Sequence, residues 1–208
     1  IGSGTHAEQV GKMMMAIETV LLDEKPDFVA VYADLNSSIA GALVAAKLNI
    51  PIIQLEAGLR SFDRSMPEEI NRLVVDRLAR ILFAPTPLQR EHLLAEGIVE
   101  GVYMVGNLIV DAIMENVPKA AEHSSILNQL ELTAKKYFLM TMHRPGVVDH
   151  KENFSKVFMG MVLLASEFNL PIIYPIHPRS RKNLTTFSLP VPNNVRLIDP
   201  LDYFDFLT

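Results

Sequence analysis

Apolar side chains near the start of the chain recur with the period of a helix. They stand at i, i+3, i+4 and i+7 as Val10, Met13, Met14, Ile17, Val20 and Leu21. This spacing predicts a helix with one apolar face. We expect the methionines on that face to pack in a hydrophobic core, since methionine fills irregular gaps between helices and sheets.

Short apolar runs bounded by turn residues follow this helix. They cover residues 28–32, 51–55, 81–84 and 102–105, and their continuous apolar character is typical of buried parallel strands. Helices are predicted between them, over 36–48, from Pro67 onward and over 87–95. Asn36 and Ser37 can cap the first of these, whose alanines allow close packing on a sheet. The alternation of strand and helix indicates βαβ units.

A polar stretch from residue 118 to 136, for which we expect some helical character, interrupts this rhythm, which then resumes. Strands are predicted at 137–141, 171–175 and 195–198, with a helix over 152–167 and the opening turns of another at the end. We expect a Rossmann-like domain over 1–118, an interdomain connection over 119–136 and a partial second domain over 137–208. The 208 residues correspond to about 1.4 domains of roughly 150 residues.

Composition narrows the possible functions. Hydrophobic residues make up 49% of the chain and charged residues 21%, which is typical of a folded protein. The formal net charge of −5 argues against a nucleic-acid partner, and no apolar run is long enough to span a membrane. The absence of cysteine excludes disulfides, thiolate metal sites and cysteine nucleophiles. We expect a cytoplasmic α/β protein without a membrane partner.

Ionisable residues stand where the predicted strands end. Asp34 and Glu56 follow the first two strands, and His143, Arg144 and His177 follow strands of the second series. Ligands of open parallel sheets bind beyond these carboxyl ends. Each residue alone has an ordinary alternative, since an aspartate there is often a helix cap and a single histidine is usually a surface or core residue. Together they form a candidate site.

The segment from 56 to 72 adds a more specific pattern. Gly58 permits an unusual backbone turn between Glu56 and Arg60. Glu68 lies in the first turn of the helix that starts at Pro67. It can form a capping box with Ser65, pair with Arg72 four residues on, or act in catalysis. We find no glycine-rich nucleotide motif, nucleophile-elbow serine or metal-ligand spacing, so no metal or cofactor is expected. The candidate chemistry is acid–base catalysis on an anionic ligand.

Seven motifs in order resemble the non-hydrolysing UDP-N-acetylglucosamine 2-epimerase family. They are YADLNSS at 32–38, EAGLRSFDR at 56–64, PEEINR at 67–72, FAPT at 83–86, HRP at 143–145, YPIHP at 174–178 and PLDY at 200–203. The resemblance runs through the whole chain. It implies two Rossmann-like domains of glycosyltransferase-B type, with parallel sheets flanked by helices. It also implies interconversion of UDP-GlcNAc and UDP-ManNAc, by elimination of UDP to 2-acetamidoglucal and re-addition.

The resemblance carries over to individual residues. Catalytic roles are implied for Asp34, Glu56, Glu68, Arg72 and His143. Contacts with the substrate or UDP are implied for Asp34, Glu56, Arg60, His143, Arg144, His177, Leu201 and Phe206. Of these, Asp34 and Glu68 would transfer protons or support the transfer, Glu56 would position the sugar, and Phe206 would lie beside the uracil. The resemblance does not say which carboxylate takes the C2 proton.

The chain also departs from the family pattern. Ala33 replaces the usual glycine before the first aspartate, and the usual Glu-Asn does not follow directly after 143–144. The family's first strand, with a diphosphate-binding arginine and lysine, would precede Ile1, and its Ser-Gly-Gly would follow Thr208. We therefore expect this chain alone to be inactive.

Further expectations and alternatives follow from the same resemblance. The family implies a homodimer and a role in cell-surface polysaccharide biosynthesis. The alternatives are an epimerase for another UDP-2-acetamido sugar, a hydrolysing UDP-GlcNAc 2-epimerase, or a non-catalytic nucleotide-sugar-binding module.

Overall fold

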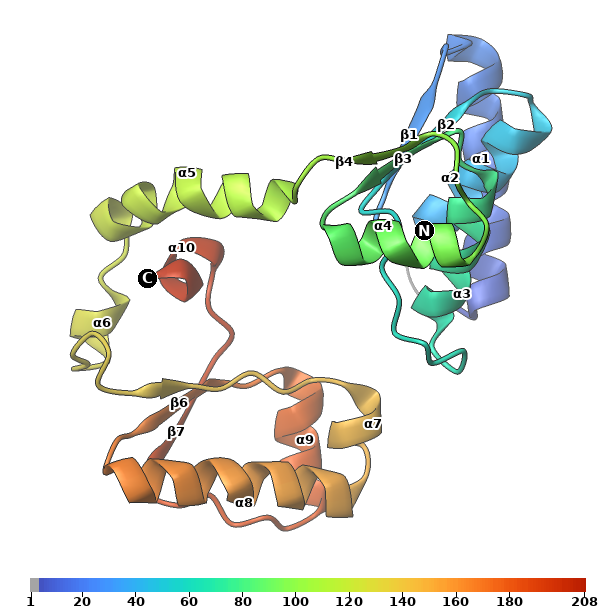
Figure 1. The fold of residues 1–208 in the computed structure, drawn as a ribbon. Helices are drawn as coiled ribbons and strands as arrows, with labels where there is room; N and C mark the ends of the chain where they lie inside the picture. Colours follow the sequence, from blue (N-terminus) through green and yellow to red (C-terminus); the bar gives the residue numbers. More distant parts are fainter. Residues whose placement is uncertain (1–3) are drawn as a thin grey trace. The chain divides into compact units, whose positions relative to one another are not determined.

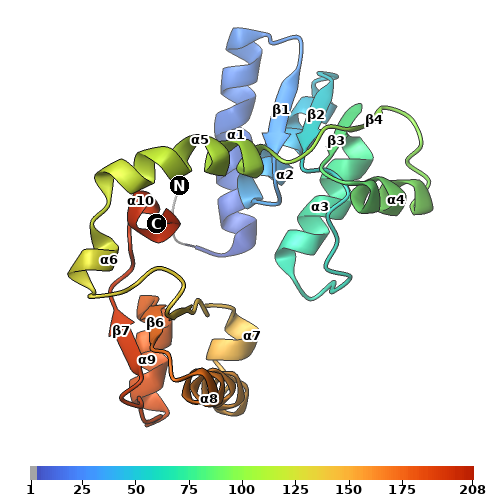
Figure 2. The same cartoon turned by 60° about the vertical axis from the view of Figure 1, so that its left-hand side comes forward.

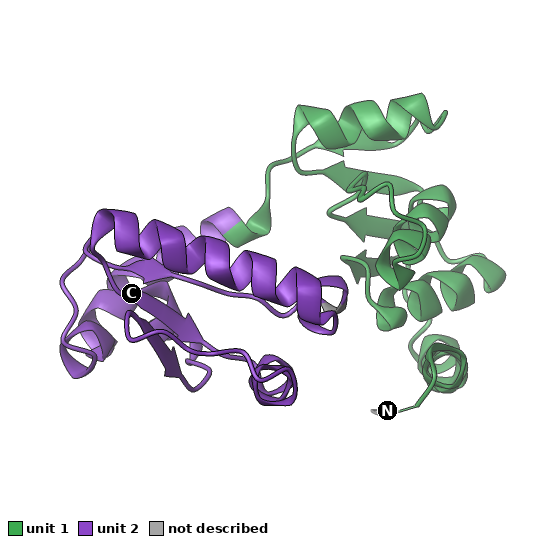
Figure 3. Cartoon of the chain, turned by 90° about the horizontal axis from the view of Figure 1, so that it is seen from below, with its two compact units in different colours: residues 1–109 green, residues 110–208 purple. Residues whose placement is uncertain are grey.

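The computed structural model describes residues 4–208, except the side chain of Pro145, and divides into two compact units, residues 1–109 and 110–208 (Figure 3). The first unit contains α1 (His6–Glu24), β1 (Val29–Tyr32), α2 (Asn36–Lys47), β2 (Ile52–Leu55), α3 (Pro67–Leu78), β3 (Ile81–Ala84), α4 (Pro87–Ala95) and β4 (Val102–Met104). The units divide within α5 (Leu108–His123). The second unit continues with α6 (Ile126–Gln129), β5 (Phe138–Leu139), α7 (Pro145–Val148), α8 (Lys151–Phe168), β6 (Ile172–Pro175), α9 (Pro178–Thr186), β7 (Val195–Ile198) and α10 (Tyr203–Leu207).

The first sheet is parallel with the strand order β1-β2-β3-β4 (Figure 1). Its registers place Val31 beside Gln54 and Gln54 beside Leu82, and all three are buried. The alternate residues face the other way, and among them Tyr32 and Tyr103 are 39% and 56% exposed. The predicted strands are therefore confirmed, but the expectation that they are buried on both faces is wrong. The residues described here bury one face of the sheet only.

Helix α2 shows why small residues are needed next to the sheet. Ala40, Ala42 and Ala45 are fully buried, so the helix backbone can approach the strands closely. Helix α1 lies against α2 (Figure 2). The helix predicted from its period is confirmed, but it has no buried residue, and Val20 is 56% exposed. Its apolar face is only half covered because its main neighbour among the described residues is this one helix.

The second sheet is parallel with the order β5-β6-β7. Its core contains the largest buried aromatic side chains of the unit: Phe154 and Phe158 of α8, and Tyr174 of β6. Strand β5 is shorter than the predicted 137–141. The amide of Met140 still donates to the carbonyl of Ile173, but the carbonyl of Met142 accepts hydrogen bonds from side chains instead of a strand.

Helices account for the other differences from the sequence pattern. The predicted end of the first domain at residue 118 falls inside α5, which contains Pro118. The predicted connection over 119–136 has the helical character expected of it, since it includes the end of α5 and all of α6. Helices α7 and α9 and the first part of α5, over residues 108–117, were not predicted. The proposed strand before Ile1 lies outside the described residues. No helix within residues 4–208 has the length and apolar character to cross a bilayer.

Candidate functional site

Two of the predicted carboxylates lie at adjacent strand ends of the first unit. Tyr32 pairs with Leu55 at the ends of β1 and β2, so Asp34 and Glu56 follow directly beyond the ladder. Ala33 and Glu56 both have left-handed backbones, with φ of 59° and 61°. Such conformations cost about 1–3 kcal/mol for a residue other than glycine and cluster at functional sites. The hydroxyl of Tyr32 donates to Oε1 of Glu56 at 3.1 Å.

Side chains from three elements hold the turn that carries Asp34. The carbonyl of Tyr32 accepts a hydrogen bond from Ser38 Oγ at 2.6 Å, and the carbonyl of Ala33 accepts one from Gln54 Nε2 at 3.3 Å. The carbonyl of Asp34 itself accepts from Nδ2 of Asn71 at 2.8 Å. Since Ser38, Gln54 and Asn71 are buried, the turn is fixed from α2, β2 and α3 together.

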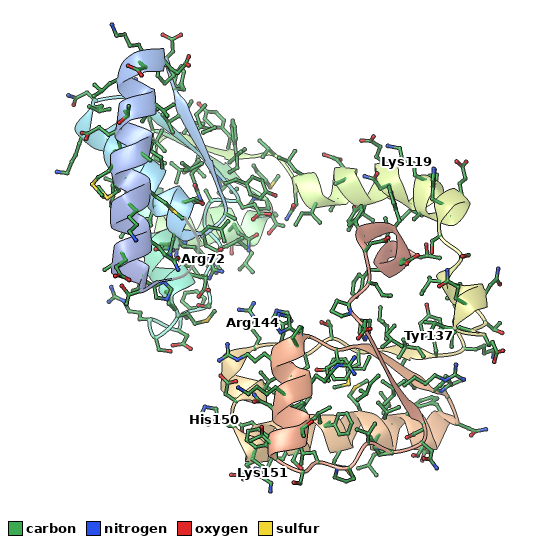
Figure 4. The ribbon with its side chains drawn as sticks, turned by 180° about the vertical axis from the view of Figure 1, so that it is seen from behind. Arg72, Lys119, Tyr137, Arg144, His150 and Lys151 are labelled. Atoms are coloured by element: carbon green, nitrogen blue, oxygen red, sulfur yellow. The ribbon has the colours of Figure 1, made fainter. Side chains whose placement is uncertain are left out.

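Arg72 joins the Asp34 carboxylate to helix α3 (Arg72 is labelled in Figure 4). One terminal nitrogen of its guanidinium forms an ion pair with Asp34 Oδ2, and the other donates to Glu69 Oε2 at 3.0 Å. The three side chains are 16%, 22% and 2% exposed for Arg72, Asp34 and Glu69. The structure therefore brings Asp34 and Arg72 together, as a half-buried pair at the sheet edge.

Glu68 forms neither the capping box with Ser65 nor the ion pair with Arg72 that the sequence allowed. The residue before the helix is Met66, which makes no side-chain cap, and Ser65 Oγ bonds to Asp63 instead. Arg72 pairs with Glu69 rather than with Glu68, so the capping box and the Glu68–Arg72 pair are wrong. Within residues 4–208 the Glu68 carboxylate has no hydrogen bond or ion pair, and the residue is partly exposed.

Arg60 forms ion pairs with two carboxylates of the protein itself. Its side chain is 1% exposed, donates to Asp76 Oδ2 at 2.7 Å and forms a two-bond pair with Glu96 at 2.7 Å each. Burial alone would lower the pKa of Arg60, but the hydrogen bonds that it donates to Glu96 and Asp76, with the negative charge of both, outweigh burial and raise that pKa. The hydrogen bond from Arg60 lowers the pKa of Glu96. This geometry gives Arg60 a structural role, and its predicted contact with UDP stays without support here.

Gly58 has the unusual backbone that its position suggested. Its φ is +80°, and a Cβ at this position would lie 2.3 Å from the carbonyl oxygen of Gln89. Its amide donates to Asp76 Oδ2 at 3.1 Å. The loop after Glu56 therefore needs glycine here both for its φ and for its close contact with α4.

In the second unit, His143 and Arg144 follow β5 (Arg144 is labelled in Figure 4). Both are exposed, and they line an open cavity of about 440 Å³ together with the preceding residues 139–142. The carbonyl of Met142 accepts hydrogen bonds from Tyr174 Oη and Ser180 Oγ, each at 2.8 Å. Burial raises the pKa of Tyr174, which keeps this phenol a donor. The buried pair holds the backbone directly before His143.

His177 occupies a different position, at the start of α9. Its Nδ1 accepts a hydrogen bond from the amide of Arg179 at 3.2 Å, so the ring caps the helix. Arg179 in turn forms a two-bond pair with Asp149 after α7. His177 therefore has a structural use as a cap, and its predicted ligand contact is not needed to explain its geometry.

Leu201 and Phe206 lie together on a narrow apolar crevice with Tyr137 and Ile173. Its volume is about 20 Å³, which holds about one water molecule. Phe206 is 46% exposed on α10. The crevice itself is too small to hold a uracil base.

Sequence reasoning missed the residues that hold the site in place. Glu69, Asn71 and Asp76 are all buried on α3, and each contacts the candidate site or its loop. Glu69 and Asp76 lie seven residues apart and so share one face of the helix, which was the available signal; Asn71 lies on another face and gave none. No group of three or more histidine, aspartate or glutamate side chains placed to hold a metal ion occurs within the described part of the chain.

Comparisons with known proteins agree on one family. The model of the UDP-N-acetylglucosamine 2-epimerase family matches residues 1–208. A UDP-N-acetylglucosamine 2-epimerase of Methanocaldococcus jannaschii is 46% identical over all of this chain and 58% of its own length. A UDP-2,3-diacetamido-2,3-dideoxy-D-glucuronate 2-epimerase of Pseudomonas aeruginosa is 36% identical over all of this chain and 57% of its own.

Solved structures give the same picture. The crystal structure of the Methanocaldococcus jannaschii UDP-GlcNAc 2-epimerase in complex with UDP-GlcNAc and UDP has a TM-score of 0.86 and 45% identity. The match covers 99% of this chain and 58% of that one. The α/β class with two parallel sheets is thereby confirmed. The chain spans a little under three fifths of the length of the curated relatives it matches.

Proposed function

Because the chain belongs to the UDP-N-acetylglucosamine 2-epimerase family, we propose that the protein interconverts UDP-GlcNAc and UDP-ManNAc. The observation that carries the proposal is the arrangement at the first sheet edge. Asp34 is held by Arg72 and by its own fixed carbonyl, while Glu68 is free to meet a ligand and Glu56 lies at the next strand end. One carboxylate paired with an arginine, a second at the next strand end and a third without a protein partner among the described residues suit proton transfer at a sugar carbon better than binding alone.

The reaction proceeds by elimination and re-addition. A carboxylate removes the C2 proton, the C1–O bond to UDP breaks, and 2-acetamidoglucal forms. UDP then bonds to C1 again while C2 accepts a proton on the opposite face, which leaves atoms and charge balanced. Asp34 and Glu68 are the proposed proton-transfer residues, and Glu56 positions the sugar.

Positive groups are needed where the diphosphate departs. Arg144 supplies a positive charge and His143 can donate a hydrogen bond. Both are exposed after β5 in the second unit and fit this task, because stabilisation of a leaving group lowers the barrier. We propose that they bind the diphosphate and that Phe206 contacts the uracil. No metal or redox cofactor enters the proposed reaction.

The decisive test is isotope exchange with UDP-GlcNAc in deuterated water. Epimerisation places deuterium at C2 of the recovered UDP-sugars and produces UDP-ManNAc. Free UDP with free ManNAc would instead indicate a hydrolysing enzyme. A protein carrying both Asp34→Asn and Glu68→Gln should lose the exchange, and normal turnover by this variant would contradict the assigned roles.

A second substrate has a specific observation in its favour. The 36% identical Pseudomonas aeruginosa relative is named for a UDP-diacetamido-glucuronate, and Ala33 places a methyl group beside Asp34 where the family pattern has glycine. The same exchange assay with that nucleotide sugar decides whether it or UDP-GlcNAc is the substrate. Binding of both sugars without exchange would favour the non-catalytic module.

The setting of the enzyme is proposed from the family alone. We propose a homodimer in the cytoplasm that supplies amino sugars for cell-surface polysaccharides. Light scattering at two protein concentrations tests the dimer, and a monomer at both would contradict it. Loss of surface ManNAc on deletion of the gene tests the role.

A further inference from the structure

A second glutamate, next to the proposed catalytic Glu68, holds the site together. Glu69 is 2% exposed and accepts four hydrogen bonds. Its Oε2 accepts from the amide of Ser61 at 2.9 Å, from Ser61 Oγ at 3.0 Å and from Arg72 at 3.0 Å, and its Oε1 accepts from the amide of Phe62 at 3.1 Å. A carboxylate with this many donors is fixed in one orientation.

These bonds connect two parts of the proposed site that are distant in sequence. Through Ser61 and Phe62, Glu69 holds the loop that follows Gly58 and leads to Glu68. Through Arg72, it holds the guanidinium whose other terminal nitrogen pairs with Asp34. The contacts therefore run without a gap from the loop to Glu69, to Arg72 and to Asp34.

The charge of Glu69 is needed as well as its shape. Arg72 lies 16% exposed between two carboxylates, and its Nε has no hydrogen-bond partner within the described residues. Without Glu69, Asp34 would be its only charged partner, and the guanidinium could turn away from the sheet edge. Burial alone would raise the pKa of Glu69, but the amides and hydroxyl of the loop and Arg72 outweigh it and lower that pKa. The group is thus ionised at neutral pH.

We propose that Glu69 is a positioning residue of the epimerisation site, which orients Arg72 against Asp34 and fixes the loop that presents Glu68. The inference rests on the proposed function for its effect on turnover. Glu69 touches no reacting atom in this assignment and acts through Arg72. A buried glutamate that only stabilised the fold would alter stability without any special dependence on Arg72.

The test is a double-mutant cycle in the complete protein with UDP-GlcNAc. Glu69→Gln should lower kcat by about tenfold to a hundredfold, as expected for small misplacement of catalytic groups, and change KM by less than about threefold. Glu69→Asp keeps the charge and should recover part of the loss. Once Arg72→Met has removed the guanidinium, Glu69→Gln should lower kcat little further, so the kcat of the double variant should match that of Arg72→Met alone.

Asp76→Asn is the matched control. It removes the charge of another buried carboxylate on the same helix that contacts Arg60 and Gly58 rather than Arg72. Its effect on kcat should multiply with that of Arg72→Met. If the effects of Glu69→Gln and Arg72→Met also multiply, or if Glu69→Gln leaves kcat unchanged in an active wild type, the proposal is overturned.

A measurement without turnover separates this proposal from the proposed function. Rotation of the Arg72 guanidinium, followed by nitrogen NMR, should be slow in the wild type and fast in Glu69→Gln. An inactive wild type with that response would refute the epimerase and keep the positioning role. A guanidinium that rotates equally in both proteins would refute the positioning role, whatever the activity.

Discussion

Arg60 forms ion pairs with Asp76 and Glu96, and we expect substitutions of Arg60 and Asp76 to destabilise the protein by unequal amounts. Arg60→Met leaves Asp76, which is 1% exposed, with the Gly58 amide as its hydrogen-bond donor. Asp76→Asn leaves Arg60 in its two-bond pair with Glu96. Removing the partner of a buried charge costs about 3–5 kcal/mol. Losing one hydrogen bond to a charged group costs about 1.5–3 kcal/mol.

We therefore expect Arg60→Met to destabilise the first unit by about 2 kcal/mol more than Asp76→Asn, the difference between these two costs. Amide hydrogen exchange of α3 measures this by mass spectrometry, because it reports the opening of that unit alone. The difference corresponds to about a thirtyfold difference in exchange rates, at 1.4 kcal/mol for each factor of ten. The double variant should cost less than the sum of the two single variants.

The pH dependence provides a further check on the same variants. Burial raises the pKa of Asp76 from its ordinary value of 3.8, with Arg60 opposing this effect. Because this pKa is raised, the folded state binds a proton at Asp76 more readily than the unfolded state does. Its unfavourable buried charge is therefore neutralised as the pH falls towards that pKa. The cost of Arg60→Met should therefore shrink in acid. A cost for Asp76→Asn equal to or above that of Arg60→Met, or one for Arg60→Met that grows in acid, would refute the reasoning.

Three shorter predictions concern other positions of the first unit. Gly58→Ala should destabilise this unit by more than the roughly 1 kcal/mol of a left-handed alanine, because the new methyl carbon would lie 2.3 Å from the Gln89 carbonyl oxygen. Urea unfolding followed by circular dichroism measures the loss of stability. Ala33→Gly should stabilise the same unit by about 1 kcal/mol, since φ is +59° there, and an unchanged or lower midpoint would count against strain at this turn. Glu96→Gln should be destabilising at pH 7 and lose that effect as the pH falls below about 4.5. Arg60 lowers the pKa of Glu96, so the stabilisation from the Glu96 carboxylate is present above its ordinary pKa and lost in acid. A gap between wild type and Glu96→Gln that stays constant from pH 7 to pH 3.5 would contradict this.

Elements with a clear local pattern were predictable to the residue. Strand β3 and helix α4 have the predicted bounds because an apolar run of four residues and a proline at the helix start mark them. Helix α9 was missed since its sequence is polar nearly throughout, and it is held by burial of Ser180 and Leu184 and by the ion pair of Arg179 with Asp149. That burial depends on tertiary packing, which a local pattern does not contain.

The same limit applies to the site. Strand ends located Asp34 and Glu56, because the carboxyl ends of neighbouring parallel strands share one edge. The sequence could not say which glutamate of the pair 68–69 points inward, since that depends on the rotation of α3 about its axis. It also suggested a ligand for Arg60, whose buried partner Asp76 lies 16 residues away and becomes visible only when the loop folds back on the helix.

Helix α3 carries Glu68 and Glu69 in its first turn and Arg72 and Asp76 in the next two, over about 12 Å at 1.5 Å per residue. It contacts the loop, the turn after β1 and the cluster at Arg60, so we expect these parts to open together. The segment should behave as one cooperative opening unit, in which the amides of Ser61, Phe62 and the helix exchange with a common free energy. Any ligand that tightens one end of the helix would then protect the other end by the same amount.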